Sequence, residues 1–156
     1  MKQNYLLFFF LLFITPLASY ASPENKQLEF VENKGQWVEP FLYKAGTGNG
    51  AVYLEKNGFT YVIGAESNLK KMGSMHKGAD SGILYYHAYK VFFENARQPE
   101  SITPAKVQSY YNNYFRGSDP KRWKGGIHPC LNVDYKNIYN GVDLHVSSEN
   151  QQIKYD

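Results

Sequence analysis

Two of the three Asn-Gly pairs, Asn57-Gly58 and Asn140-Gly141, are the features that most constrain how this 156-residue chain can fold. An Asn-Gly pair accepts the positive backbone dihedral angles that tight β-hairpins require. Segments rich in aromatic and β-branched residues flank both pairs: 51–55 and 59–63 around the first, 131–135 and 142–146 around the second. The sequence therefore predicts two hairpins, and we expect a positive φ at Asn57 or Gly58.

Other segments of similar composition predict further strands, because Tyr and β-branched residues favour extended backbone. The segment 83–93 is the longest, and its largely apolar faces predict a central strand covered on two sides. Residues 152–155 are expected to pair with 142–146 across 148–150. Between strands, 64–82 is polar and reads as a long exposed loop, and 99–104 reads as a connection. The remaining predicted strands are 28–32, 36–38, 41–45 and 107–115.

Asp119-Pro120 predicts the one short helical turn of the chain. The Asp side chain can accept from free backbone amides, while Pro fits the first helical position. This turn should run through Trp123 and end at Gly125-Gly126. Many short strands with so little helix predict an all-β fold, an antiparallel sandwich-like sheet.

The N-terminus has the pattern of a secretory signal peptide. Lys2 supplies a positive charge, residues 5–14 are almost all apolar, and Ser19-Tyr20-Ala21 offers small residues for cleavage. The apolar run is short for a membrane span, which needs roughly 20 residues, although a retained signal anchor is the alternative. We predict that residues 1–21 are removed on export, leaving a single β-rich domain at 22–156 with no membrane association.

Charge and cysteine content exclude several classes of protein. The chain has 17 Lys and Arg against 14 Asp and Glu, too even a balance to predict nucleic acid or an anionic membrane as partner. Cys130 is the only cysteine, so an internal disulfide is impossible. A buried apolar role is expected for it, with a reactive thiol or an intermolecular bridge as alternatives. The four histidines lack a short metal-ligand spacing, and we predict neither metal nor cofactor.

Asp119, Asp134 and Asp143 are the carboxylates from which an acid/base pair could be drawn. A glycosidase needs two carboxyl groups roughly 5–10 Å apart across the sugar. Asp119 already has the capping role, and Asp143 follows an Asn-Gly turn, where bonding to the backbone is expected. Since a Gly-x-Ser-x-Gly motif is also missing, the sequence does not predict an enzyme.

Aromatic residues are the candidate binding groups. They could form an exposed platform for glycans or for another domain, but the same side chains could instead be core residues of a sheet. Coplanar exposed rings with carboxylates nearby would favour a carbohydrate site. The candidates are Trp37, Tyr110, Tyr111, Tyr114 and Trp123.

Five ordered segments together resemble a known bacterial family: 30–37, 54–61, 87–91, 111–123 and 135–144. They are similar to the N-terminal domain, of unknown function, of large surface proteins that often carry SBBP β-propeller repeats, PKD-type domains or a gliding-motility-associated C-terminal segment. The resemblance implies a β-rich architecture and a place at the cell surface. In that family the segment like 153–156 continues into more strand, so we expect this chain to be a fragment with an incomplete C-terminal sheet.

These observations predict a non-enzymatic, exported structural or adhesion module of a bacterial envelope protein. Its expected partners are other envelope or extracellular domains, with glycans as a further candidate. The alternative is a carbohydrate-binding or carbohydrate-processing domain.

Overall fold

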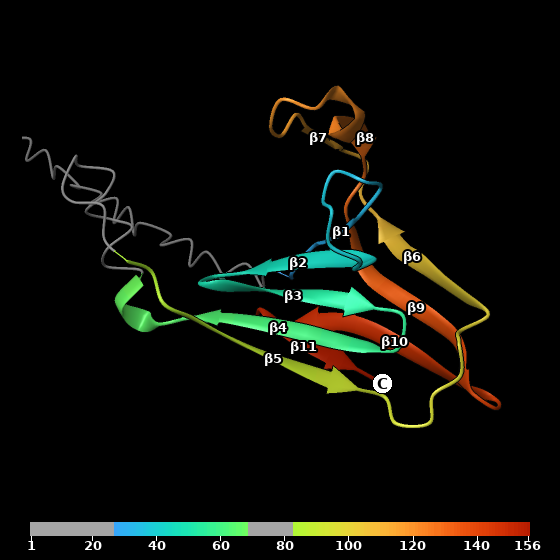
Figure 1. Cartoon of the computed structure of the whole chain (residues 1–156). Coiled ribbons are helices and arrows are strands. Elements are labelled where there is room, and N and C mark those ends of the chain that lie inside the picture. The colour runs from blue at the N-terminus through green and yellow to red at the C-terminus, as the bar shows by residue number, and fades with distance from the viewer. Residues whose placement is uncertain (1–26, 69–82) are drawn as a thin grey trace, which may run out of the picture.

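The computed structural model describes residues 27–68 and 83–156, and within them the fold is all-β (Figure 1). Five strands form an antiparallel meander in chain order. They are β1 (Phe30–Glu32), β2 (Tyr43–Thr47), β3 (Gly50–Glu55), β4 (Gly58–Gly64) and β5 (Tyr86–Phe92). Residues 66–68, after β4, form a helical turn. The predicted all-β class is confirmed.

The other half of the main sheet is built around the longest strand, β9 (Cys130–Tyr139). Its antiparallel neighbours are β10 (Val142–Glu149) and β6 (Ser101–Val107), and it joins the meander where Cys130 pairs with Phe30 of β1. Strand β11 (Gln152–Tyr155) then pairs with β10, as predicted. The sheet order is therefore β11-β10-β9-β1-β2-β3-β4-β5, with β6 beside β9.

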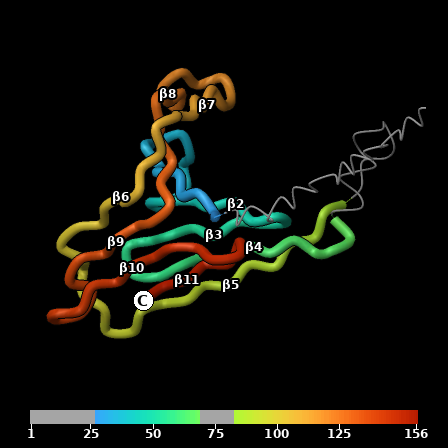
Figure 2. The backbone as a smooth tube through the Cα atoms, turned by 180° about the vertical axis from the view of Figure 1, so that it is seen from behind, coloured from blue at the N-terminus to red at the C-terminus, as the bar shows by residue number. Residues whose placement is uncertain are grey.

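The sheet curls over itself and encloses the core. Although β4 and β11 are far apart in the sheet order, the rings of Phe59 and Tyr155 lie 5.9 Å apart. Figures 1 and 2 show β10 and β11 lying across β3 and β4. Tyr135 and Phe30 are the largest fully buried side chains between the two halves. This arrangement is the sandwich-like sheet that the sequence predicts. The core cluster consists of Leu28, Phe30, Tyr43, Ala45, Val52, Leu54, Phe59, Cys130, Val133, Tyr135, Ile138 and Val146.

A small two-stranded sheet stands at one end of the main sheet (Figure 2). It pairs β7 (Asn112–Tyr114) with β8 (Lys124–Ile127), and the short 3-10 helix η1 (Pro120–Arg122) lies between them. Asp119 caps η1, accepting a hydrogen bond from the backbone N–H of Lys121 at 3.0 Å. The predicted helical turn is confirmed, but Gly125-Gly126 lies inside β8 instead of ending the turn.

Both predicted hairpins are present, with one correction. Gly141 has φ +73° between β9 and β10, as an Asn-Gly turn requires. The Asn57-Gly58 hairpin joins β3 to β4, but neither of its residues has a positive φ. Gly58 serves another purpose, because a Cβ there would lie 2.2 Å from the backbone oxygen of Val91 in β5. The glycine lets two strands approach closely.

Two strand predictions and one predicted connection need correction. Residues 36–38 are a bent loop, and of 107–115 only Val107 and Asn112–Tyr114 are in strands. The predicted connection at 99–104 is instead largely part of β6, where Pro104 pairs with Val133. Proline is tolerated there because β6 is paired only with β9, so a missing N–H can face away from the ladder.

The segment 83–93 does not supply a central strand. Its strand, β5, is the edge of the meander, and every residue of it except Val91 is exposed. Apolar residues on both of its faces predicted that other segments pack against them, but the described part of the chain places no such segments there. The predicted signal peptide at 1–21 and most of the predicted loop at 64–82 lie outside the described residues.

Cys130 has the buried role that was expected, with 1% of its surface exposed. Burial, and then the negative charge of Glu32, raise the pKa of its thiol to about 12, so it stays protonated. No helix in residues 27–68 or 83–156 has the length and apolar character needed to cross a bilayer.

Candidate functional site

A cleft of about 700 Å³ lies between one face of the meander and the segment that carries η1. Strands β2 to β5 supply one wall, the loop 37–41 supplies another, and residues from 116 to 122 close the third side. The volume is in the range of small-ligand sites. Its lining residues are Trp37, Glu39, Pro40, Phe41, Lys44, Tyr53, Glu55, Thr60, Val62, Lys90, Arg116, Gly117 and Arg122.

Hydrogen bonds of two side chains shape the loop that presents Trp37. Asn33 Oδ1 accepts from the backbone N–H groups of Gly35 and Trp37, and its Nδ2 donates to the carbonyls of Glu39 and Phe41. Gln36 is fully buried, where its Nε2 donates to the Glu32 carbonyl and its Oε1 accepts from the backbone of Lys34. Because Gly35 has φ +98°, the chain can reverse direction here. Residues 33–36 therefore fix the position of the indole.

Four aromatic rings meet at the cleft. The ring of Trp37 lies 5.4 Å from Phe41 and 5.2 Å from Tyr114 of β7, and Phe41 lies 4.8 Å from Tyr53 of β3. The interplanar angles are 44–60°, so the rings form an angled wall instead of a flat platform. The Trp37–Tyr114 contact also joins the small sheet to the main sheet.

Lys44 lies against this wall. Its neighbours on β2, Tyr43 and Ala45, are buried in the core, so strand alternation turns Lys44 to the opposite face. The ammonium is 5.6 Å from the centroids of both Trp37 and Tyr53, within the range of cation–π attraction. Partial burial, and then the positive charge of Arg116, lower the pKa of Lys44. Two cations thus share the cleft at close enough range to repel each other.

The cleft has two carboxylates, and one of them is already engaged. Glu55 Oε1 accepts hydrogen bonds from Thr60 Oγ1 at 2.5 Å and from Lys90 Nζ at 3.0 Å. Burial alone would raise the pKa of Glu55, but the bonds from Thr60 and Lys90 outweigh it and lower the pKa. The other carboxylate, Glu39, is exposed. In the described part of the chain, Lys44, Arg116 and Arg122 make no ion pair with a carboxylate.

Two hydrogen-bond donors of the cleft residues have no partner. Trp37 Nε1 and Arg122 Nε are both buried as atoms and lack an acceptor among the described residues. A buried donor without an acceptor costs about 1–3 kcal/mol. At such positions an ordered water or a ligand usually supplies the acceptor. Both side chains belong to the cleft lining, although the two donor atoms themselves are closed to solvent in this structure.

The five aromatic residues predicted to bind lie at separate places. Trp37 and Tyr114 meet at the cleft, whereas Trp123 packs on Phe115 and donates from Nε1 to the Gly117 carbonyl at 3.2 Å. Tyr110 donates its hydroxyl to the carboxylate of Glu29. Tyr111 packs edge-on to His128, with 5.8 Å between the ring centroids.

The sequence-based search missed Lys44, Tyr53, Arg116 and Arg122. Two signals were available: Lys44 alternates with two core residues in a strand, and Arg116 and Arg122 flank the predicted Asp119-Pro120 turn. Neither signal says that these segments meet. Their convergence depends on tertiary structure.

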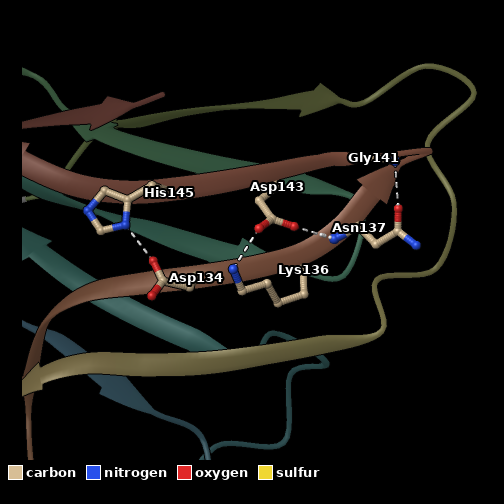
Figure 3. Close-up of polar contacts among 6 residues, drawn as sticks. All are labelled: Asp134, Lys136, Asn137, Gly141, Asp143 and His145. Atoms are coloured by element: carbon tan, nitrogen blue, oxygen red, sulfur yellow. Dashed lines mark hydrogen bonds and ion pairs between the residues drawn. The ribbon is translucent and has the colours of Figure 1, made fainter.

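The carboxylates considered for catalysis have structural partners (Figure 3). Asp143 Oδ2 accepts from Lys136 Nζ at 2.6 Å, and its Oδ1 accepts from the backbone N–H of Asn137 at 2.8 Å, as expected for a residue after an Asn-Gly turn. Asp134 contacts His145 Nδ1 across the β9–β10 pair. Together with the Asp119 cap, these contacts stabilise local structure. Among the residues described, no three His, Cys, Asp or Glu side chains group as metal ligands, and His76 lies outside that range.

Comparison with known proteins gives one match. Residues 30–156 match a family described as a domain of unknown function, DUF7948. Neither a curated protein nor a solved structure matches the chain.

Proposed function

We propose that this chain, which belongs to the DUF7948 family of domains of unknown function, is a non-enzymatic structural or adhesion module whose contact surface is the cleft. It acts outside the cytoplasm, in a bacterial surface protein of the kind that carries SBBP repeats, PKD-type domains or a gliding-motility-associated segment. The signal-like residues 1–21 and the resemblance of five ordered segments support this placement. Its partners are other envelope or extracellular components.

The observation that carries the proposal is the set of unpaired binding groups in one cleft. Lys44, Arg116 and Arg122 make no ion pair within the described residues, and Trp37 Nε1 has no acceptor there. Cations that have no ion-pair partner on a preformed surface are available to a partner that carries hydrogen-bond acceptors.

The carboxylates of the cleft favour holding a partner over cleaving it. Hydrolysis of a glycosidic bond uses two carboxyl groups, one of them able to donate a proton. Glu55 is held as a carboxylate by Thr60 and Lys90, which makes it a poor proton donor near neutral pH. That leaves Glu39 as the only other carboxylate in the lining.

Carbohydrate binding is the second candidate function. The angled wall of Trp37, Phe41 and Tyr53 offers apolar faces beside several hydrogen-bond donors, a combination that suits the apolar faces and polar rim of a sugar ring. The rings are not coplanar, so a long row of stacked sugars does not fit this wall.

The proposal can be tested by cell attachment. The chain is expressed in full, recovered after export and coupled to beads, and the attachment of beads to cells of the producing bacterium is counted. We expect attachment well above that of blank beads, reduced at least by half by Arg116→Glu in the cleft. Arg97→Glu is the matched control, because Arg97 is an exposed cation outside the lining.

Equal attachment by wild type and Arg116→Glu would overturn the assignment of the cleft as contact surface. Attachment no greater than that of blank beads would overturn the adhesion role. Release of new reducing ends from envelope polysaccharide, above the level with blank beads, would overturn the non-enzymatic assignment.

A further inference from the structure

The cleft has more positive than negative charge. Lys90 is neutralised by Glu55, with 3.0 Å between Nζ and Oε1. Lys44, Arg116 and Arg122 then face a single carboxylate, Glu39, in the lining. A ligand that carries negative charge would relieve the repulsion between Lys44 and Arg116, and it would be attracted at a distance because the cleft focuses the field of the cations.

A ligand in the cleft would contact mainly side chains, namely the aromatic rings and the cations, and little of the backbone. Strands β3 and β4 are each paired on both edges, and Lys44 of β2 is paired with Val31 on one side and Tyr53 on the other. An extended peptide usually binds by adding a strand to an open edge. Of the strands in this wall, only β5 has an open edge, and Lys90 is its one residue in the lining. Recognition on β2, β3 and β4 therefore depends on rings, ammonium and guanidinium groups, a pattern that favours a saccharide over a peptide.

Resting on the binding function proposed above, we propose that the cleft binds an acidic saccharide through a uronate-type sugar. The sugar carboxylate lies among Lys44, Arg116 and Arg122, where a guanidinium can hold it with two parallel hydrogen bonds. The apolar face of the sugar contacts the wall formed by Trp37 and Tyr53, and its hydroxyl groups accept from the remaining N–H groups of the cations. Arg116 and Lys44 determine the preference for charge.

The test compares ligands matched in length. Binding of the full chain, recovered after export, is measured by titration calorimetry against tetragalacturonate, the neutral tetrasaccharide mannotetraose and tetraglutamate. We expect binding of tetragalacturonate that weakens as salt rises, and binding of mannotetraose at least tenfold weaker. Arg116→Gln and Lys44→Gln should each raise the Kd for tetragalacturonate roughly tenfold, as for loss of a charge-assisted hydrogen bond. Arg97→Gln should leave it within twofold.

A second measurement places the ligand. The chain has two tryptophans, so Trp123→Phe leaves Trp37 as the sole indole. Its emission should change on addition of tetragalacturonate, and the same change should need at least tenfold more mannotetraose. Thermal unfolding of each variant checks that the fold is intact, which is expected because Arg116 is exposed and makes no ion pair in the described structure.

Each opposite result overturns the inference in a distinct way. Equal binding of the charged and neutral sugars would refute the role of charge, and tighter binding of tetraglutamate would assign the cleft to an acidic peptide. Failure to bind tetragalacturonate would refute the ligand class. In each case the bead assay decides separately whether the module is adhesive, because it does not depend on which ligand is chosen.

Discussion

Tyr135 connects the two halves of the curled sheet through a single hydroxyl group. Its side chain is fully buried on β9, and the hydroxyl donates to the carbonyl of Glu55 at the end of β3 at 2.9 Å. Tyr135→Phe keeps the ring but leaves that carbonyl without this donor, so the free energy of unfolding should fall by about 1–2 kcal/mol. Chemical denaturation followed by fluorescence measures the change.

Tyr139→Phe is the control for this prediction. Tyr139 donates to the Glu94 carbonyl at 3.0 Å, but it is exposed, and water can replace its hydroxyl. We expect a change within about 0.5 kcal/mol. Equal losses of unfolding free energy in the two variants would show that burial does not determine how much the Tyr135 hydrogen bond stabilises the fold.

Glu55 should make stability depend on acid pH. Its pKa is lowered in the fold from the ordinary 4.5, since the hydrogen bonds from Thr60 and Lys90 outweigh burial. The unfolded chain therefore binds a proton before the folded chain does, and the stabilising contribution is complete above pH 4.5 and is lost as pH falls through the lower, folded pKa.

The thermal midpoint of Glu55→Gln should consequently change less than that of the wild type between pH 5 and about pH 3. Glu149→Gln, an exposed carboxylate on β10, serves as control and should follow the wild type. A Glu55→Gln chain that loses as much stability on acidification as the wild type would contradict the assignment.

At the scale of single elements, Gly58 lets strands β4 and β5 approach each other closely. A Cβ at this position would lie 2.2 Å from the Val91 oxygen and 3.2 Å from the Val91 carbonyl carbon, and both are backbone atoms that cannot rotate away. Gly58→Ala should destabilise the fold by about 1–3 kcal/mol, as in other overpacked sites. Thermal unfolding measures this shift.

Gly46→Ala is the matched control, because Gly46 also lies in a strand and an added Cβ would meet nothing within 4 Å. We expect no loss of stability there. If Gly58→Ala were as stable as Gly46→Ala, the register between β4 and β5 would have to be wrong.

Strands set by local chemistry could be predicted from the sequence, and those set by distant partners could not. Asn140-Gly141 gave a correct hairpin because the turn itself requires Gly141 to have a positive φ. Strand β6 was missed because Pro104 is unfavourable in most strands and acceptable only where one edge is unpaired. The edge position of β5 was missed because apolar faces do not tell which neighbours exist.

The same limit applies to the candidate site at the scale of the whole molecule. Trp37 and Tyr114 were predicted from residue type alone, and the structure brings them together at 5.2 Å across 77 positions of sequence. Lys44 and Tyr53 are cross-strand partners in the β2–β3 hairpin, but Arg116 comes from a distant segment, so its approach to them depends on where the small sheet stands. Local patterns in a single sequence do not show which distant segments come into contact.

The curl itself should depend on the last strand, β11. Ile153 packs against the core from this strand, and the ring of Tyr155 contacts Phe59 on β4. The backbone groups of His145 and Asp156 exchange two hydrogen bonds of 2.9 and 3.0 Å, which extend the pairing of β10 with β11.

If β11 covers the core as part of the cooperative fold, truncating Ile153 removes packing that stabilises the whole sheet. Because the side chain is partly buried, Ile153→Ala should lower the free energy of unfolding by about 1–2 kcal/mol, less than the loss at a fully buried site. Gln152→Ala, at an exposed position of the same strand, should change it by less than about 0.5 kcal/mol. Chemical denaturation measures both values, and amide exchange of β4 reports whether the effect reaches the opposite half of the sheet. An unchanged unfolding midpoint in Ile153→Ala, with faster exchange confined to β11, would show instead that this strand opens on its own and that the core holds without it.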